Sequence, residues 1–280
     1  MKIKKNSGGG IKMSVGNYKK YVGSDNPSMF VILLDQSLSM EENFAGSDKQ
    51  TKAAQAVNRV IAEIGRQSLK EMEHSPRCWI EVIGYGNGSA DSIVSGMITD
   101  VMAHPTELVS EEVEDSKGGL TEMKSGIWVK PKAKGGTPMT DAYEKASEKI
   151  SVWIQDHPDC FPPVVINITD GQPNRLESAK EAAKRLMELA SSDGQVLLMN
   201  AHIQETPADS ILVPVSLPES ITPDAKFLFD ISSEIPDNLL ANAISSGLPA
   251  EKGSRAFLYR ANAEALIKLI NFGSSMGFKR

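Results

Sequence analysis

The chain contains two short, almost uninterrupted apolar runs, MFVILL at residues 29–34 and PVVINIT at residues 163–169. Runs of this length and composition are typical of strands that are buried on both faces of a sheet. Further strand-like runs follow along the chain, CWIEVIGYG, QVLLMNAHI and RAFLYR. Because segments with helical spacing separate most of these runs, the sequence predicts an α/β domain with a largely parallel sheet and helices on both faces.

The predicted helices are amphipathic. The first begins near Thr51, the second begins at Met139, the third spans residues 177–190 and the last spans residues 262–272. Between the first two, CWIEVIGYG and SIVSGMITDVM are separated by a turn rich in Gly and Asn, which predicts a β-hairpin. Residues 103–136 show a less regular pattern. Two short helices are expected within residues 224–244.

The order of these elements predicts one domain. Residues 1–28, rich in Gly, Lys, Ser and Asn, are expected to form a loose N-terminal arm. Residues 29–273 form the domain, in which residues 204–250 are an irregular insertion or extension. Within it, prolines interrupt the apolar run ILVPVSLP, which is expected to be an edge or irregular element at best. Residues 274–280 are a tail, and the sequence contains no internal repeat.

Charge and hydropathy exclude several classes of partner. The net charge is −6, and no block of Lys and Arg interleaved with aromatic residues predicts a nucleic-acid groove. No apolar run approaches the roughly 20 residues needed to cross a membrane, and the lysine-rich start lacks the apolar stretch of a secretion signal. Cys78 and Cys160 are expected to be buried free thiols in a reducing compartment. We therefore expect a cytoplasmic protein with neither a nucleic-acid nor a membrane partner.

Oxygen-bearing side chains follow both of the buried apolar runs. Asp35, Ser37 and Ser39 come after the first run and Asp170 comes after the second, while Thr137 lies in the loop before the second helix. In an open parallel sheet, ligands bind beyond the carboxyl ends of the strands. Two carboxylates and three hydroxyls at that edge predict a site for a hard cation.

Each of these residues also has a purely local explanation. Ser37 or Ser39 fits the N-cap of a helix, and Thr137 before a proline fits an N-cap with Pro at the first helical position. Asp170 with Gly171 is a common turn pair. Taken singly, the local explanation is favoured for each residue. The convergence of all five on one sheet edge favours the cation site.

The five residues resemble the metal-ion-dependent adhesion site of the von Willebrand factor A (vWA) family, written as D-x-S-x-S followed by a Thr and then an Asp. DQSLSM, GGTPMTDA and ITDG supply these parts in order. The resemblance covers residues 29–273 and departs at Leu38, where intracellular members usually have Gly. It implies a Rossmann-like, doubly wound sheet of six strands in the order 3-2-1-4-5-6, with the third strand antiparallel.

The resemblance also implies how the site works. In the family the two serines bind Mg²⁺ directly and the carboxylates act mostly through water, while the threonine switches between the two modes. Neutral hydroxyl ligands leave the ion electrophilic, so a Glu or Asp of a partner protein completes its shell. Mn²⁺ or Ca²⁺ can stand in its place. The expected function is a non-enzymatic, Mg²⁺-dependent protein–protein interaction module.

The resemblance is to stand-alone cytoplasmic vWA proteins of bacteria, associated with tellurite resistance and with kinase–phosphatase–vWA signalling or defence systems. It implies a Ser/Thr kinase and a PP2C-type phosphatase as partners. One alternative is an adaptor for a MoxR-like AAA+ ATPase. Another is a Mg²⁺-dependent phosphoryl-transfer enzyme with Asp35 as nucleophile. It is disfavoured because the loop offers serines instead of a second carboxylate, and because no obvious catalytic lysine follows a strand.

No catalytic residue or organic cofactor is predicted. The four histidines lack ligand spacing, and GYGNGSA at residues 84–90 runs into another strand rather than opening a helix, so it is not a dinucleotide loop. Glu41, Glu42 and Asn43 follow the first ligand loop and could set the charge around the cation, but a solvated acidic loop is favoured.

Overall fold

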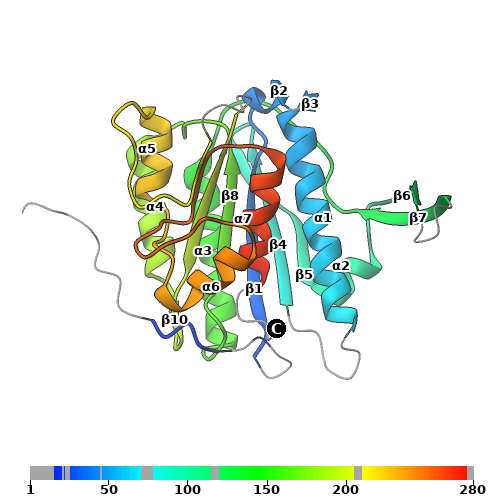
Figure 1. Ribbon diagram of the computed structural model, residues 1–280, viewed down its shortest axis with the longest axis horizontal. Helices are drawn as coiled ribbons and strands as arrows, with labels where there is room; N and C mark the ends of the chain where they lie inside the picture. The colour runs from blue at the N-terminus through cyan, green and yellow to red at the C-terminus, as the bar shows by residue number, and fades with distance from the viewer. Residues whose placement is uncertain are drawn as a thin grey trace, which may run out of the picture.

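A seven-stranded sheet forms the centre of the molecule (Figure 1). The computed structural model describes residues 16–20, 22, 26–44, 46–70, 78–114, 120–204 and 210–275. The strands lie in the order β12-β13-β11-β8-β1-β4-β5. Their bounds are Ser28–Asp35 (β1), Cys78–Gly86 (β4), Ser89–Met97 (β5), Val164–Thr169 (β8), Leu197–Ile203 (β11), Ile211–Leu212 (β12) and Phe257–Ala261 (β13). The five inner strands are parallel, and β5 and β12 are antiparallel edge strands.

The prediction of six strands is wrong, because the sheet has seven and its order extends past β13 to β12. This strand is only two residues long and pairs with β13 through Ile211↔Tyr259 and Leu212↔Leu258. Pro214 follows almost at once and has no backbone N–H for a ladder. Because such a short strand has no room for an alternating pattern, periodicity does not reveal it.

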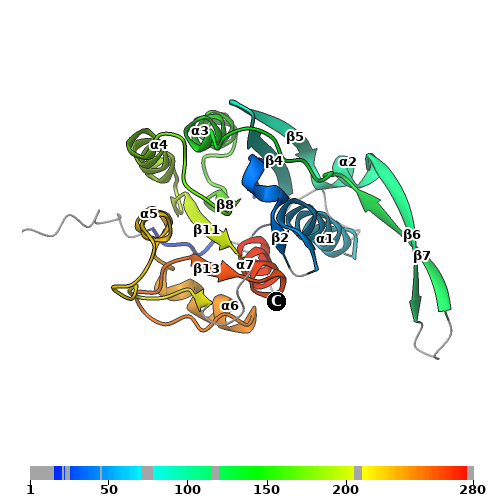
Figure 2. The same ribbon diagram turned by 90° about the horizontal axis from the view of Figure 1, so that it is seen from above.

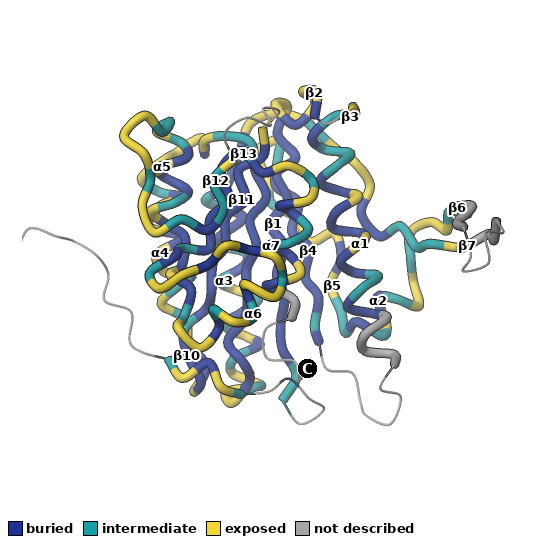
Figure 3. The backbone as a smooth tube through the Cα atoms, viewed as in Figure 1, coloured by how far each residue is buried: buried dark blue, intermediate teal, exposed yellow. Residues whose placement is uncertain are grey.

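Two layers of helices cover the sheet (Figure 2). One face is covered by α1 (Lys49–Lys70), α2 (Ile98–Ala103), α6 (Leu240–Ser245) and α7 (Ala263–Ser275). The other is covered by α3 (Met139–Asp156), α4 (Leu176–Glu188) and α5 (Pro223–Asp230). In β1, Ile32 and Leu34 pack into the first layer while Val31 and Leu33 pack into the second. Alternate residues of a strand point to opposite faces, so both faces of this strand are buried and its run is apolar throughout (Figure 3).

The hairpin predicted around residue 87 is confirmed, since β4 and β5 pair antiparallel across an Asn87-Gly88 turn. The second run was expected to stay extended to residue 102, but Ile98–Ala103 is the helix α2. Its buried residues Ile98 and Val101 are three apart, and a helix of six residues is too short for periodicity to identify.

The irregular segment before α3 contains a second hairpin that was not predicted. It is formed by β6 (Glu107–Glu114) and β7 (Leu120–Ile127), which pair antiparallel and project away from the sheet and its helices (Figure 2). At its base the Leu108 side chain is exposed. A hairpin outside the main body has no face to bury against the core, so its sequence does not show the alternation that marks a strand.

Shorter elements complete the described chain: β2 (Asn43–Phe44) with β3 (Ser47–Asp48), β9 (Ala190–Ser191) with β10 (Gly194–Gln195), and the 3₁₀ turns Leu38–Glu41 and Asp237–Leu239. In the N-terminal segment, Tyr18 is buried and its N–H donates to the carbonyl of Asp193. The Asp193 carboxylate accepts the backbone N–H groups of Lys19 and Lys20. The described part of this segment is therefore attached to the β9–β10 turn.

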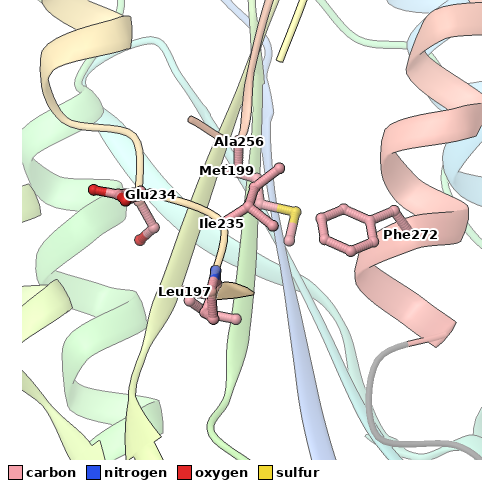
Figure 4. A pocket seen from close by; sticks show the side chains of 8 residues that line it. Leu197, Met199, Glu234, Ile235, Ala256 and Phe272 are labelled. Atoms are coloured by element: carbon pink, nitrogen blue, oxygen red, sulfur yellow. The ribbon is translucent and has the colours of Figure 1, made fainter. Parts of the chain in front are cut away.

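Cys78 and Cys160 are both buried free thiols, as predicted. A gap between β11 and α7 is lined by apolar side chains such as Met199, Ile235 and Phe272 (Figure 4). This gap has no room for a water molecule, so it is a feature of packing and does not hold a ligand. None of the described helices is long and apolar enough to span a membrane.

Candidate metal centre

The site is built where β1 and β8 end side by side. The two strands are parallel neighbours, with Leu34 opposite Ile168, so the residues that follow each strand emerge at the same edge of the sheet. The hydroxyl of Thr169 donates to Oδ2 of Asp35 at 2.5 Å and joins the two strand ends directly. Sequence reasoning missed Thr169, although a polar residue ending a fully buried run was a signal for it.

Asp35 is 1% exposed, and both of its carboxylate oxygens are hydrogen-bonded. Oδ1 accepts the backbone N–H of Ser37 at 2.8 Å, while Oδ2 accepts the Thr169 hydroxyl. Burial raises the pKa of Asp35 from 3.8 to about 6, although hydrogen bonds from Ser37 and Thr169 oppose the rise. The donors that we see on this carboxylate are neutral, so a nearby cation would stabilise its ionised form.

The two serines connect the first loop to the second. The hydroxyls of Ser37 and Ser39 are 3.1 Å apart, and the Ser39 hydroxyl donates to Oδ1 of Asp170 at 2.7 Å. Ser37 occupies the N-cap of the 3₁₀ turn Leu38–Glu41, but its side chain makes no capping hydrogen bond. A continuous network of polar contacts therefore joins Asp35, Thr169, the two serines and Asp170.

Thr137 reaches the same edge through its backbone. Its N–H donates to Oδ1 of Asn174 at 2.9 Å, and its carbonyl accepts the N–H of Asn174 at 3.0 Å, which fixes it beside the loop that carries Asp170. Helix α3 begins at Met139 with Pro138 at its N-cap, so Thr137 is not the capping residue of this helix. No hydrogen bond joins the Thr137 hydroxyl to the other four predicted residues, all of which lie in the described part of the chain.

The loop that carries Thr137 is held against the first ligand loop by backbone hydrogen bonds. Lys134 donates its N–H to the carbonyl of Gln36 at 2.7 Å, and the carbonyl of Gly135 accepts the N–H of Leu38 at 2.9 Å. Gly135 has φ +70°, and a Cβ there would lie 2.7 Å from Cα of Asn87. A glycine is required at this position both for its conformation and for its space.

A cationic residue that was not predicted also lies in the site. Nζ of Lys49 is 2.7 Å from Oδ2 of Asp170 and 2.6 Å from Oε2 of Glu42. The side chains of Lys49 and Asp170 are 5% and 1% exposed, whereas Glu42 is 68% exposed at the rim. Burial by itself lowers the pKa of Lys49, but its hydrogen bonds to Asp170 and Glu42 outweigh burial and raise it above its ordinary value.

The first residue of a helix is an unfavourable place for a cation, because the helix dipole is positive there. Lys49 occupies that position in α1, so its charge needs a local partner. The sequence predicted that this helix begins near Thr51, two residues later, so it carried no signal that marked Lys49. The prediction of a solvated acidic loop holds for the exposure of Glu41 and Glu42, but it missed the pairing of Glu42 with Lys49.

The donor set suits a hard cation. Hydroxyl and carboxylate oxygens are the ligands that Mg²⁺ and Ca²⁺ prefer. Within the described ranges, no group of three or more His, Cys, Asp or Glu side chains is arranged to hold a metal ion. A cation at this edge would therefore depend on the serine and threonine hydroxyls as well as on the two carboxylates.

Solved structures with a similar fold include SpaC, a pilus adhesin from Lactobacillus rhamnosus GG. It is 14% identical, with a TM-score of 0.53, over 91% of this chain and 31% of SpaC. The SpRpn10 VWA domain is 12% identical, with a TM-score of 0.40, over 65% of this chain and 78% of that one. At these identities the likeness concerns the fold alone.

Manganese-loaded TRAP protein from Plasmodium vivax is 15% identical, with a TM-score of 0.34, over 65% of this chain and 59% of TRAP. The chain thus spans less than two thirds of both the SpaC and the TRAP chains. No protein-family model matches the sequence, and no curated protein matches it.

Proposed function

We propose that the chain is a protein–protein interaction module that binds a partner's Glu or Asp side chain through Mg²⁺ at the edge of the sheet. The observation that carries the proposal is the hydrogen-bonded cluster of Asp35, Ser37, Ser39 and Asp170, gathered from loops more than 100 residues apart. Only a tertiary arrangement assembles such a set, and its members are hard oxygen donors.

The proposal assigns different roles to the hydroxyls and the carboxylates. The hydroxyls of Ser37, Ser39 and Thr137 would hold the ion. Asp170 accepts the Ser39 proton, so the free lone pairs of that hydroxyl are available to a cation. Asp35 fixes the backbone of the loop at Ser37. When bound, Mg²⁺ supplies an electrophilic position that a partner's carboxylate can occupy; Mn²⁺ or Ca²⁺ can take its place.

Calorimetric titration of the chelated protein with MgCl₂ or MnCl₂ tests the cation site. Ser37→Ala and Ser39→Ala should each weaken binding at least tenfold, and Asp35→Ala should abolish it. Ser147→Ala is the matched control, because the Ser147 hydroxyl bonds only to the carbonyl of Tyr143 within α3. If the three site variants bind the ion like the wild type and the control, the cation site is elsewhere and the proposal fails.

The setting is a further part of the proposal. We place the module in the cytoplasm of a bacterium, in a signalling, stress or defence system with a Ser/Thr kinase and a PP2C-type phosphatase. An adaptor role for a MoxR-like AAA+ ATPase uses the same site with a different partner. Pull-downs with Mg²⁺, with EDTA and with Asp35→Ala as bait separate a partner that depends on the site from one that does not.

Phosphoryl transfer is the second candidate, because Lys49 brings the cation that such enzymes need next to a carboxylate. However, Lys49 contacts Asp170 and not Asp35, and Asp35 is buried with both oxygens accepting hydrogen bonds. A buried, hydrogen-bonded carboxylate is a poor nucleophile. Two results together would favour this candidate: hydrolysis of acetyl phosphate that is lost in Asp35→Asn, and a covalent phosphoryl group of about 80 Da on Asp35.

A further inference from the structure

A lysine ammonium contacts the carboxylate of Asp170, so the candidate site contains a positive charge as well as oxygen donors. Asp170 Oδ1 accepts the Ser39 hydroxyl and Oδ2 accepts the Lys49 ammonium, both at 2.7 Å. The Lys49 and Asp170 side chains are almost completely buried, so water screens their attraction only weakly. The ammonium, which also pairs with the exposed carboxylate of Glu42 at 2.6 Å, therefore offsets the charge of Asp170 from inside the protein.

The start of α1 holds Lys49 in this position. Asp48 Oδ1 accepts the backbone N–H of Thr51 at 2.7 Å, which caps the helix immediately after the small β2–β3 hairpin. The backbone N–H of Lys49 donates to the carbonyl of Glu42, and Phe44 is buried beneath the hairpin. The ammonium is thus built into the fold and does not lie on a free surface side chain.

We propose that Lys49 sets the charge of the candidate metal centre, so that the site binds divalent cations more weakly but binds an acidic partner more strongly once the cation is present. The inference rests on the proposed function. A divalent cation bound by Ser39 would experience repulsion from the ammonium, which lies one carboxylate away. The ammonium, although it is shared with Glu42, also offsets the charge of Asp170, so more of the positive charge of the bound ion is left to attract a partner's carboxylate.

The two effects have opposite signs, and this gives the inference its test. In Lys49→Met, which keeps the length of the side chain and removes its charge, Mn²⁺ should bind about tenfold more tightly in calorimetric titration. Acetate serves as the carboxylate probe. Its binding to the Mn²⁺-loaded variant, measured by water proton relaxation at constant ionic strength, should be at least threefold weaker than to the wild type.

Lys49→Arg keeps the charge and should resemble the wild type in both measurements. Lys226→Met is the matched control, because Lys226 forms an exposed pair with Asp230 in α5 and lies outside the site. A lysine with a purely structural role would produce a different result. Its loss would loosen the loop and weaken Mn²⁺ and acetate together, and that outcome overturns the inference.

The melting temperature in EDTA gives a readout that needs no metal. Lys49→Met leaves Asp170 buried without its cation and should lower the melting temperature, whereas adding Asp170→Asn to that variant should recover part of the loss. If the wild type binds no Mn²⁺, the proposed function fails and this inference fails with it. If the wild type binds Mn²⁺ and folded Lys49→Met binds it no more tightly, only the inference about Lys49 fails.

Discussion

The stability of the metal-free protein should fall as pH rises from about 4 to above 6, because of Asp35. The folded protein holds the proton of this carboxyl more tightly than the unfolded chain does, since burial raises its pKa from 3.8 to about 6. A group of this kind stabilises the fold fully below its unfolded pKa. That stabilisation is lost as pH rises through the folded pKa.

The magnitude follows from the two pKa values. One pKa unit corresponds to about 1.4 kcal/mol, so ionisation of Asp35 in the folded state should cost about 3 kcal/mol. Asp35→Asn removes the titrating group while keeping the shape of the side chain. The free energy of unfolding should therefore depend less on pH in this variant, and the wild-type-minus-variant difference should change by about 3 kcal/mol between pH 3.5 and pH 7.5.

Urea denaturation in EDTA, followed by circular dichroism at several pH values, measures this difference. Other carboxylates titrate in the same range, but they contribute to both proteins and cancel in the comparison. Adding Mg²⁺ at pH 7.5 should restore stability to the wild type and leave Asp35→Asn nearly unchanged. Parallel pH profiles for the two proteins would show that Asp35 keeps an ordinary pKa, and the reasoning from burial would then be wrong.

Two further substitutions test the supports of the site. Gly135→Ala should lower the free energy of unfolding by about 1–3 kcal/mol and weaken Mn²⁺ binding, because φ is +70° and the new Cβ would meet the backbone of Asn87. Gly171→Ala is the control: it lies beside Asp170, but a Cβ there would meet open space, so neither quantity should change. Asn167→Ala should lower the free energy of unfolding by roughly 3 kcal/mol in urea denaturation. Fully buried Asn167 accepts the hydroxyl of Tyr85 at 2.7 Å and donates to Oδ1 of Asn200 at 3.0 Å, and the substitution removes both bonds.

The sequence predicted the parts of the fold that bury a patterned face. The runs of β1 and β8 are apolar throughout because both of their faces are covered, and the longer helices show a stripe that faces the sheet. The hairpin Glu107–Ile127 and the two-residue strand Ile211–Leu212 lack such a face or such a length. Their existence depends on tertiary pairing, which local periodicity does not record.

The site shows the same division between local and tertiary information. Asp35, Ser37, Ser39 and Asp170 were predictable because each follows a recognisable strand, and parallel strands bring their carboxyl ends together. Lys49 was not, because its partner Asp170 lies 121 residues away and its own neighbourhood is an ordinary amphipathic helix. The sequence pattern identifies residues that follow a strand. It does not identify Lys49, whose ammonium reaches the carboxylate of Asp170 only in the folded structure.

Leu38, which departs from the family pattern, is accommodated without strain. Its backbone is not in the left-handed region, so the position does not require glycine, and its N–H donates to the carbonyl of Gly135. The side chain is 57% exposed, and its neighbours in the chain are Ser37 and Ser39. An exposed apolar side chain therefore stands in the loop that carries the two serines.

The two carboxylates of the site differ in what stabilises them, and this difference determines what a cation would do there. Asp170 is already paired with the ammonium of Lys49. The hydrogen bonds on Asp35 come instead from neutral groups, Ser37 and Thr169, and burial raises its pKa. An added divalent cation therefore gains most at Asp35, where the buried charge lacks such a pairing. The free energy of unfolding should therefore fall when Asp35 ionises and rise again when Mg²⁺ is added. Both changes would measure how much this buried carboxylate lacks a cationic partner.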